Sequence, residues 1–392
     1  MERADAAAQP ASPGAVRIVP ATTRSDRDRF IRVPFALYAD DPNWVPPLIV
    51  ERRAHLDPAA NPFFRHAEAA LFLAERGGRT VGRISAQADS LALRQYGAPI
   101  GHFGFLEAED DPAVFAALLG AAEDWLRERG MRRVRGPLSF SINDEVGLLI
   151  DGFDTPPSMM MGHARPYYAA RLAALGYAKA KDLYAYEFRL DRDPLPRAAR
   201  RQVERLRADP RVTLRPLRRR AFAAEIRAVL DVFNDAWSGN WGFVPLTEAE
   251  IDRLARDMKP LLRDDHVCIA EVDGEPAAFG VALPNLNEAI ADLGGALLPF
   301  GWARLLWRLK AGRMRTARLP LMGVRRRYQN SPFGAALAFA VIERLHAAFA
   351  RRGFERGELS WILEDNRPMR HILRAIGAVP YKTYRVFEKD LG

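Results

Sequence analysis

The tract Val324-Arg-Arg-Arg-Tyr-Gln-Asn-Ser-Pro-Phe-Gly334 joins an apolar run, 319–324, to a segment of helical periodicity, 335–351. A strand that leads through a short polar loop into a helix directs backbone N–H groups and the positive end of the helix at one point. Three consecutive arginines add positive charge. The tract predicts a cradle for a phosphate or pyrophosphate group, the alternative being a basic loop between an ordinary strand and helix.

Further strands and helices follow the cradle in a regular order. The pattern predicts a buried strand over 357–363, a short helix that ends at Ile376, and a closing strand over 381–388. Asn366 stands before the short helix and Gly377 after it, as expected for helix boundaries.

This order of elements, with Gln329 and Gly334 in the loop, resembles the GNAT superfamily of acyl-CoA-dependent N-acyltransferases. Pro332 replaces the middle glycine of that family's loop and removes one amide donor. Leu373 stands where the family often has a tyrosine as general acid. The resemblance implies acyl-CoA as co-substrate, and a main-chain N–H of Gly323 or Val324 as oxyanion donor. The residues expected to bind acyl-CoA are Gly323, Val324, Arg325, Arg327, Tyr328, Gln329, Asn330, Ser331, Phe333, Gly334, Ala335 and Asn366.

Length and composition limit the possibilities. A chain of 392 residues exceeds the usual size of one core, so two domains are expected. The single cysteine excludes an internal disulfide framework and suits a reducing compartment, and the seven histidines show no metal-ligand spacing. The net charge of +9 favours acidic partners and leaves CoA, nucleic acid and anionic lipid open.

Landmarks of the first half recur in the second about one domain length later, which indicates a duplication. The repeated pairs are Ala74-Glu75 with Ala270-Glu271, Gly130 with Gly353, and Gly176 with Gly377. We therefore predict an α/β (α+β) fold of two tandem GNAT-like domains, each a mixed, mostly antiparallel sheet flanked by helices. The predicted parts are a disordered tail (1–15), an N-terminal domain (16–190), a basic helical connector (191–211) and a C-terminal domain (212–392).

The first domain differs where the cofactor would bind. Its tract Glu107-Ala-Glu-Asp-Asp111 is acidic and cannot cradle phosphate, so we expect this copy to have lost CoA binding. The resemblance to tandem GNAT proteins implies that it forms a wall of the acceptor pocket. Its strand over 184–190 is expected to close the first unit.

The segment 293–318 mixes leucine and aromatic residues with exclusively basic charge. This composition is typical of a helix that lies on an anionic membrane without crossing it. The alternative is an amphipathic helix packed on its own domain, with solvated arginines. For the connector 191–211, a solvated helix and a strip facing lipid or nucleic acid both stay open.

With a tandem GNAT order and this insert, the chain resembles the bacterial ceramide synthase group. The tracts that carry the resemblance are Asp41-Pro-Asn-Trp-Val-Pro-Pro47, Ser141-Ile-Asn-Asp-Glu-Val-Gly147 with Asp151-Gly-Phe153, and 357–366. It implies N-acylation of a sphingoid base in sphingolipid metabolism. From the composition of the insert and the cysteine usage we expect a cytoplasmic protein that is peripheral on the inner face of the cytoplasmic membrane. A peptide or small-amine acceptor, and a non-catalytic scaffold that binds acyl-CoA or nucleic acid, remain alternatives. Under the leading interpretation no nucleic-acid partner is expected.

Four side chains are candidate catalytic groups. Glu145 lies in a polar tract and could instead hold a turn, and His163 could be a base near neutral pH or a satisfied core histidine. Glu358 could face the cleft or solvent, because strand faces alternate, and Tyr384 could replace the missing tyrosine or fill the core. The candidate substrate-binding residues are Asn143, Trp241 and Asn285.

Overall fold

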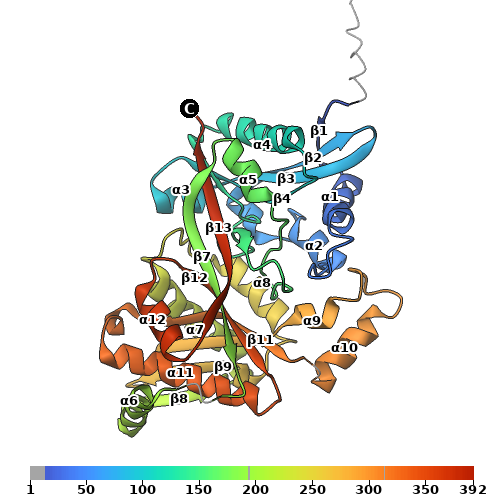
Figure 1. The fold of residues 1–392 in the computed structure, drawn as a ribbon. Coiled ribbons are helices and arrows are strands. Elements are labelled where there is room, and N and C mark those ends of the chain that lie inside the picture. Colours follow the sequence, from blue (N-terminus) through green and yellow to red (C-terminus); the bar gives the residue numbers. More distant parts are fainter. Residues whose placement is uncertain (1–13, 193–194, 313) are drawn as a thin grey trace, which may run out of the picture.

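One mixed sheet runs through the whole protein. The computed structural model describes residues 14–192, 195–312 and 314–392, and its strands form the order β1-β2-β3-β4-β5-β13-β7-β12-β11-β10-β9-β8, with β6 paired to β13 (Figure 1). Neighbouring strands are mostly antiparallel; among the described strands, only the pairs β4 with β5 and β11 with β12 are parallel. This architecture confirms the predicted fold class of a mostly antiparallel sheet flanked by helices.

The two halves supply the elements in a similar order. The first half contains β1 (Arg17–Pro20), α1 (Arg24–Leu37), α2 (Ile49–His55), η1 (Pro62–Arg65), β2 (Ala67–Arg76), β3 (Arg79–Asp89), α3 (Ser90–Tyr96), β4 (Ile100–Ala108), α4 (Pro112–Arg127), β5 (Arg133–Gly136), β6 (Leu148–Asp151), α5 (Tyr168–Ala174) and β7 (Ala178–Arg189).

The second half contains α6 (Arg197–Ala208), β8 (Val212–Pro216), η2 (Arg219–Ala221), α7 (Phe222–Trp237), α8 (Glu248–Met258), η3 (Asp264–His266), β9 (Val267–Val272), β10 (Glu275–Pro284), α9 (Leu286–Ile290), α10 (Gly301–Ala311), β11 (Thr316–Val324), η4 (Arg326–Tyr328), α11 (Pro332–Ala350), β12 (Arg356–Leu363), α12 (Arg367–Ala375) and β13 (Val379–Asp390).

Local sequence explains the equivalent elements of each half. The hairpin β2–β3 turns at Gly77 and Gly78, and the hairpin β9–β10 turns at Asp273 and Gly274, all four with positive φ. A long helix, α4 in the first half and α11 in the second, then packs its apolar side chains on the sheet. By length and composition α11 could span a membrane, but most of it is buried in the second core.

The last strands of the halves are exchanged. β7 was expected to close the first unit, but it lies between β12 and β13, and β13 in turn pairs with β5 and β6 of the first half. The two strands run side by side through the middle of the molecule (Figure 1). The sheet therefore continues across the expected boundary, and the division at 190 and 212 stays a prediction.

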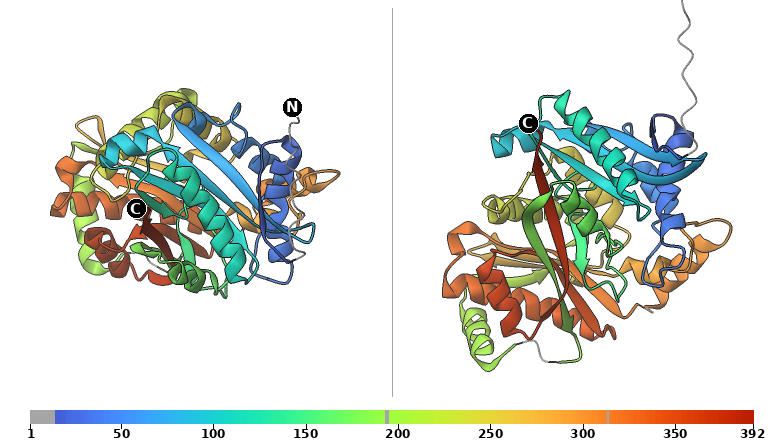
Figure 2. Two further views of the ribbon diagram at one scale, coloured as in Figure 1. Left: turned by 90° about the horizontal axis from the view of Figure 1, so that it is seen from above. Right: turned by 45° about the horizontal axis from the view of Figure 1, so that its top comes forward.

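The insert 293–318 is only partly the predicted surface segment. α10 lies at the edge of the molecule, beside the α1–α2 segment in both views of Figure 2, and Ile49 N donates to Gly295 O at 2.9 Å. Residues 316–318, however, belong to β11, and Arg318 is buried rather than at the surface, so its assignment to a surface helix was wrong. Arg313 and most of the predicted tail, residues 1–13, lie outside the described residues, as do 193 and 194 of the connector.

Candidate active site

A cavity opens where the parallel strands of the second half separate. β11 and β12 pair from Thr316 with Arg356 to Leu319 with Leu359, after which β11 continues beside β10 and β12 beside β7. The gap holds a cavity of about 400 Å³, here called the cradle cavity. The loop and the first turn of α11 contribute Gln329, Asn330, Ser331, Gly334 and Ala335 to its wall.

Side-chain hydrogen bonds fix the loop of the cradle cavity. Ser331 caps α11, because its Oγ accepts from Gly334 N at 3.0 Å and donates to Tyr328 O at 2.6 Å. Gln329 Nε2 donates to Val324 O at 2.7 Å. A Cβ at Gly334 would lie 2.1 Å from Tyr328 O, so only glycine fits there. Because Pro332 has no N–H, and Gly334 N and Ala335 N bond to Ser331 Oγ and Ser331 O, the loop brings the positive end of α11 to the cavity rather than a row of free N–H groups.

The charge of the cradle cavity suits an anion. No aspartate or glutamate is among the described residues that line it, and the helix N-terminus contributes positive potential. The fit to the phosphates of a CoA-type ligand therefore depends on backbone donors and the helix end.

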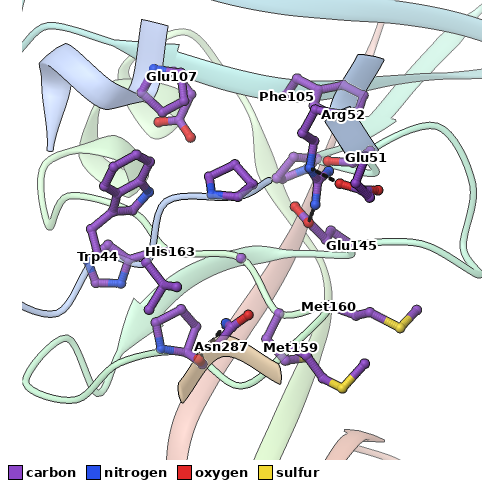
Figure 3. A pocket seen from close by; sticks show the side chains of 18 of the residues that line it. Trp44, Glu51, Arg52, Phe105, Glu107, Glu145, Met159, Met160, His163 and Asn287 are labelled. Atoms are coloured by element: carbon purple, nitrogen blue, oxygen red, sulfur yellow. Dashed lines mark hydrogen bonds and ion pairs between the residues drawn. The ribbon is translucent and has the colours of Figure 1, made fainter. Parts of the chain in front are cut away.

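A second cavity lies at the equivalent place in the first half. The parallel pair β4 and β5 runs from Ile100 with Arg133 to His102 with Arg135. Beyond it lies a cavity of about 290 Å³, here called the acidic cavity, whose wall includes Glu51, Glu107 and Glu145 (Figure 3). Segments 44–52 and 157–163 and helix α9 complete the wall.

Glu107 is the least compensated carboxylate of the acidic cavity. Its Oε2 accepts from the hydroxyls of Tyr38 at 2.6 Å and Tyr168 at 2.8 Å. Its Oε1 lies 3.9 Å from Arg83 Nη2, beyond hydrogen-bond range. Burial raises the pKa of Glu107 to about 7, against the opposing effect of Arg83.

His163 lines the same cavity with one free ring nitrogen. Nε2 lies 2.9 Å from Asp41 Oδ2 and so carries the proton that it donates to the carboxylate. Burial lowers the pKa of His163, which keeps the ring neutral near pH 7. Its buried Nδ1 has no partner in the part of the chain that the structure describes, so it is an available acceptor.

Glu145 is paired instead. Arg52 donates to its carboxylate and also contacts Glu51, with Arg52 Nε 3.0 Å from Glu51 Oε2. Burial alone would raise the pKa of Glu145, but the Arg52 guanidinium lowers it below its usual value. In Figure 3 this pair lies across the cavity from Glu107, Trp44 and His163.

Arg318 lies between the linings of the two cavities. Its guanidinium donates to Met159 O, whose residue lines the acidic cavity, and to Ser360 Oγ at 3.0 Å, whose residue lines the cradle cavity. Glu358 lies 3.5 Å from Arg318 and compensates its buried charge. Arg318 therefore links the two linings and is here called the Arg318 wall.

Comparison with known proteins assigns the family. No family model matches the chain. It is 50% identical over 375 residues to the bacterial ceramide synthase of Caulobacter vibrioides (strain NA1000 / CB15N), covering 95% of this chain and 97% of the relative. The chain belongs to the bacterial ceramide synthase family. A second relative in this family group, protein YghO of Escherichia coli (strain K12), is 49% identical over 368 residues, which are 94% of each chain.

Solved structures confirm the tandem GNAT fold of this ceramide synthase family member. The tandem GNAT protein from the clavulanic acid biosynthesis pathway has a TM-score of 0.57 at 15% identity, over 96% of this chain and 99% of its own. A GCN5-related N-acetyltransferase from Sphaerobacter thermophilus has a TM-score of 0.54 at 14% identity, over 95% and 96%. Family and fold together confirm the predicted N-acyltransferase class, and the fold implies use of an acyl-CoA.

Not all predicted cofactor residues line the cradle cavity of this ceramide synthase family member. Gly323, Val324 and Asn366 do, with the five loop residues named above. Arg325 and Arg327 point away from it, because they form ion pairs with Asp231 and Glu275. Tyr328 and Phe333 pack on the second core, with their rings 5.5 Å apart.

The four candidate catalytic residues divide between two places. Glu145 and His163 line the acidic cavity, whereas Glu358 and Tyr384 are buried outside the linings of both cavities. Ser360 and Tyr381 donate to Glu358, and the hydroxyl of Tyr384 has no partner within the described ranges.

The candidate substrate residues lie next to the cavities rather than in them. Asn143 Nδ2 donates to Val244 O at 3.2 Å, and the Trp241 ring lies under Arg135, with the guanidinium carbon 4.8 Å from the ring centroid. Asn285 caps α9 and accepts from Met159 N at 2.9 Å, which holds the wall segment in place.

Sequence reasoning missed several lining residues. Glu107 was dismissed as part of an acidic loop, although it belongs to β4, and Trp237, Trp361 and His371 of the cradle cavity were not singled out. Trp237 Nε1 donates to Met322 O at 3.0 Å. Among the described residues, no group of three or more His, Cys, Asp or Glu side chains is placed to hold a metal ion.

Proposed function

We propose that the protein transfers the acyl group of a long-chain acyl-CoA to the amine of a sphingoid long-chain base. The observation that carries the proposal is the cradle cavity, which lies at the N-terminus of α11 and has no aspartate or glutamate among the described residues that line it. The name of the Caulobacter relative supports the acceptor, because a ceramide is an N-acylated sphingoid base.

In this proposal the loop residues and first turn of α11 bind the pyrophosphate, and the thioester lies where β11 leaves β12. Arg325 N donates to Ala277 O on the β10 side, and the alternation of an antiparallel pair then turns the N–H of Val324 to the open side. Val324 is therefore the better oxyanion donor of the two expected, with Gly323 beside it.

His163 is the better candidate for the base. His163 lines the acidic cavity, its Nδ1 has no hydrogen-bond partner among the described residues, and Asp41 fixes the orientation of the ring, whereas Glu145 is neutralised by Arg52. The ammonium gives one proton to Nδ1, and the amine nitrogen then bonds to the thioester carbonyl carbon. The C–S bond then breaks, and the sulfur leaves as the thiol with the second proton that the nitrogen loses when the amide forms. We assign Glu358 and Tyr384 to the wall around Arg318 instead.

The test is mass spectrometry of the products after incubation of the protein with palmitoyl-CoA and sphinganine or 3-ketosphinganine. An amide product from the wild type that is lost in Gly334→Trp is expected. Gly120→Ala is the matched control, because a Cβ at Gly120 meets nothing within 4 Å. Acyl-CoA binding without an amide would exclude this acceptor, and absence of acyl-CoA binding would exclude the enzyme reading in favour of a scaffold.

We also propose that the protein is peripheral on the inner face of the cytoplasmic membrane, through α10 and the turn before it. Leu298 is 79% and Phe300 73% exposed, and Trp302 and Leu306 are exposed as well. The charged side chains of α10 are all basic, although Arg304 and Arg308 pair with Asp292 before the helix. Sedimentation with phosphatidylglycerol vesicles should decrease for Phe300→Ser with Trp302→Ser. The control Val379→Ser removes an exposed apolar side chain from the start of β13, away from α10. Equal sedimentation of the control and the Phe300→Ser, Trp302→Ser variant would contradict the proposal.

A further inference from the structure

Glu107 has one carboxylate oxygen available in the acidic cavity. Both tyrosine hydroxyls bind Oε2, and Oε1 has no hydrogen-bond partner among the described residues. Tyr168 is oriented for this, because its hydroxyl accepts from Ala108 N at 3.0 Å and so directs its own proton to Glu107. A buried carboxylate with one unused oxygen lacks part of the stabilisation that burial requires.

Other polar atoms around the cavity also lack partners. Arg83 Nε and His163 Nδ1 are buried without a hydrogen bond in the part of the chain that the structure describes. Tyr38 connects this group: its hydroxyl donates to Glu107, and its ring centroid lies 5.5 Å from that of His163. An acceptor nitrogen and a carboxylate oxygen thus flank one aromatic ring.

The charge on the far side of the cavity is already balanced. The positive charge of Arg52 is balanced by the carboxylates of Glu145 and Glu51, which both contact it. A positively charged ligand would find Glu107, whose Oε1 lies 3.9 Å from Arg83 and accepts no hydrogen bond from the described residues. The ring of Trp44, which stacks on Tyr38, lines the same cavity as an aromatic face that favours a cation.

We propose that the acidic cavity binds the protonated amine of the acceptor, with Glu107 as its counter-ion and His163 Nδ1 as acceptor for the same or the adjacent polar group. The inference rests on the proposed function, because it takes the acceptor to be an amine. In this proposal the two cavities bind substrates of opposite charge. The cradle cavity binds the anionic acyl-CoA, and the acidic cavity binds the cationic amine.

The position of the cavity fits a lipid amine. α9 lines the acidic cavity, and the turn that follows it contacts the 47–49 segment, which lines the cavity too. That turn leads directly into the exposed apolar residues before α10. A lipid that leaves a membrane at α10 therefore reaches the acidic cavity first, and only the Arg318 wall then separates it from the cradle cavity.

Steady-state kinetics of Glu107→Gln with sphinganine and palmitoyl-CoA test the inference. We expect KM for sphinganine to rise at least tenfold while KM for palmitoyl-CoA stays within twofold. Glu109→Gln is the matched control, since Glu109 follows two residues later and pairs with Arg79 at the surface. Glu107→Asp should recover part of the affinity for sphinganine.

A binding measurement without turnover tests recognition of the amine's charge in the wild type, independently of whether the variant folds. The wild type should bind sphinganine at least tenfold more tightly than an analogue in which a hydroxyl replaces the amine, and Glu107→Gln should bind both alike. Equal binding of the two by the wild type overturns the inference even where the variant does not fold. An unchanged KM for sphinganine in a folded Glu107→Gln variant overturns the inference and leaves the proposed function intact. A wild type that neither binds nor acylates sphinganine instead contradicts the proposed function, because sphinganine is then not its acceptor.

Discussion

The two halves build a cavity from the same backbone and give it opposite chemistry. In each half a parallel strand pair separates, and the helix that follows begins with a capping side chain and a proline: Asp111 and Pro112 for α4, Ser331 and Pro332 for α11. Two positions further, the first half has Val114 and the second Gly334. Val114 is buried in the first core, whereas a side chain at Gly334 would collide with Tyr328 O of the loop. The loop before α11 can therefore adopt its conformation only with glycine at this position.

The charge of the side chains that line the cavities also differs between the two halves. Glu107 is the second-last residue of β4 and lines the acidic cavity, whereas β11 contributes no acidic side chain to the cradle cavity. The comparison shows that the first half keeps a cavity at the equivalent place but lines it with carboxylates.

The largest effect is expected at the wall that both cavities share. Arg318→Met leaves Glu358 buried without its cation, which should cost about 3–5 kcal/mol of unfolding free energy. Chemical denaturation measures the loss. The double variant Arg318→Met with Glu358→Gln should recover most of it, because no unpaired charge remains. A single variant as stable as the wild type would mean that the wall does not depend on this ion pair.

The second prediction makes the cradle cavity resemble its counterpart. Gly334→Val introduces the residue type of position 114 against Tyr328 O, and should lower kcat/KM for acyl-CoA about 100-fold or more. Isothermal titration with acyl-CoA should show the same loss. Gly120→Val in α4 is the control for valine in a helix, and equal activity of the two variants would contradict a role for close approach at Gly334.

Local patterns predicted most elements and the cradle, but not their long-range pairing. The strand 184–190 has the same local signals whichever partner it takes, so its place between β12 and β13 could not be derived from the sequence. The missed helix α8 had a readable signal, the capping box from Thr247 to Glu250.

Site residues were predictable where backbone geometry requires a residue type, as at Gly334. Charges near the cradle were less predictable, because Arg325 and Arg327 have the right composition but point to Asp231 and Glu275. Conversely, Glu107 lay in a tract dismissed for its acidity. Both cases depend on side-chain direction, which sequence spacing does not fix at the end of a strand.

The third prediction changes charge while it keeps the helix cap. Ser331→Asp retains a good N-cap for α11 but places a carboxylate at the cradle cavity, and should weaken acyl-CoA binding about tenfold, or about 1.4 kcal/mol, by repulsion of phosphate. The reverse exchange, Asp111→Ser, should leave acyl-CoA binding unchanged. Fluorescence titration of both variants decides, and equal affinities would mean that the phosphates do not lie at this helix end.

The smallest effect is expected at a histidine that connects the two halves. His66 of the first half has Nδ1 2.9 Å from Asp89 Oδ1 and Nε2 3.3 Å from Glu250 Oε1 of α8. Burial opposes its charge, but the two carboxylates raise the pKa of His66 from 6.5 to about 9. Because the folded pKa is the higher one, this stabilisation is complete below pH 6.5 and is lost as pH rises through about 9.

His66→Gln should therefore lower Tm by about 2–4 °C at pH 6, and the difference from the wild type should vanish above pH 9.5. Thermal melts at several pH values measure it, with His371→Gln, from the exposed part of α12, as control. A difference that is constant with pH would mean that the ring packs between the halves without carrying charge. The contact between the first half and α8 would then rest on packing alone.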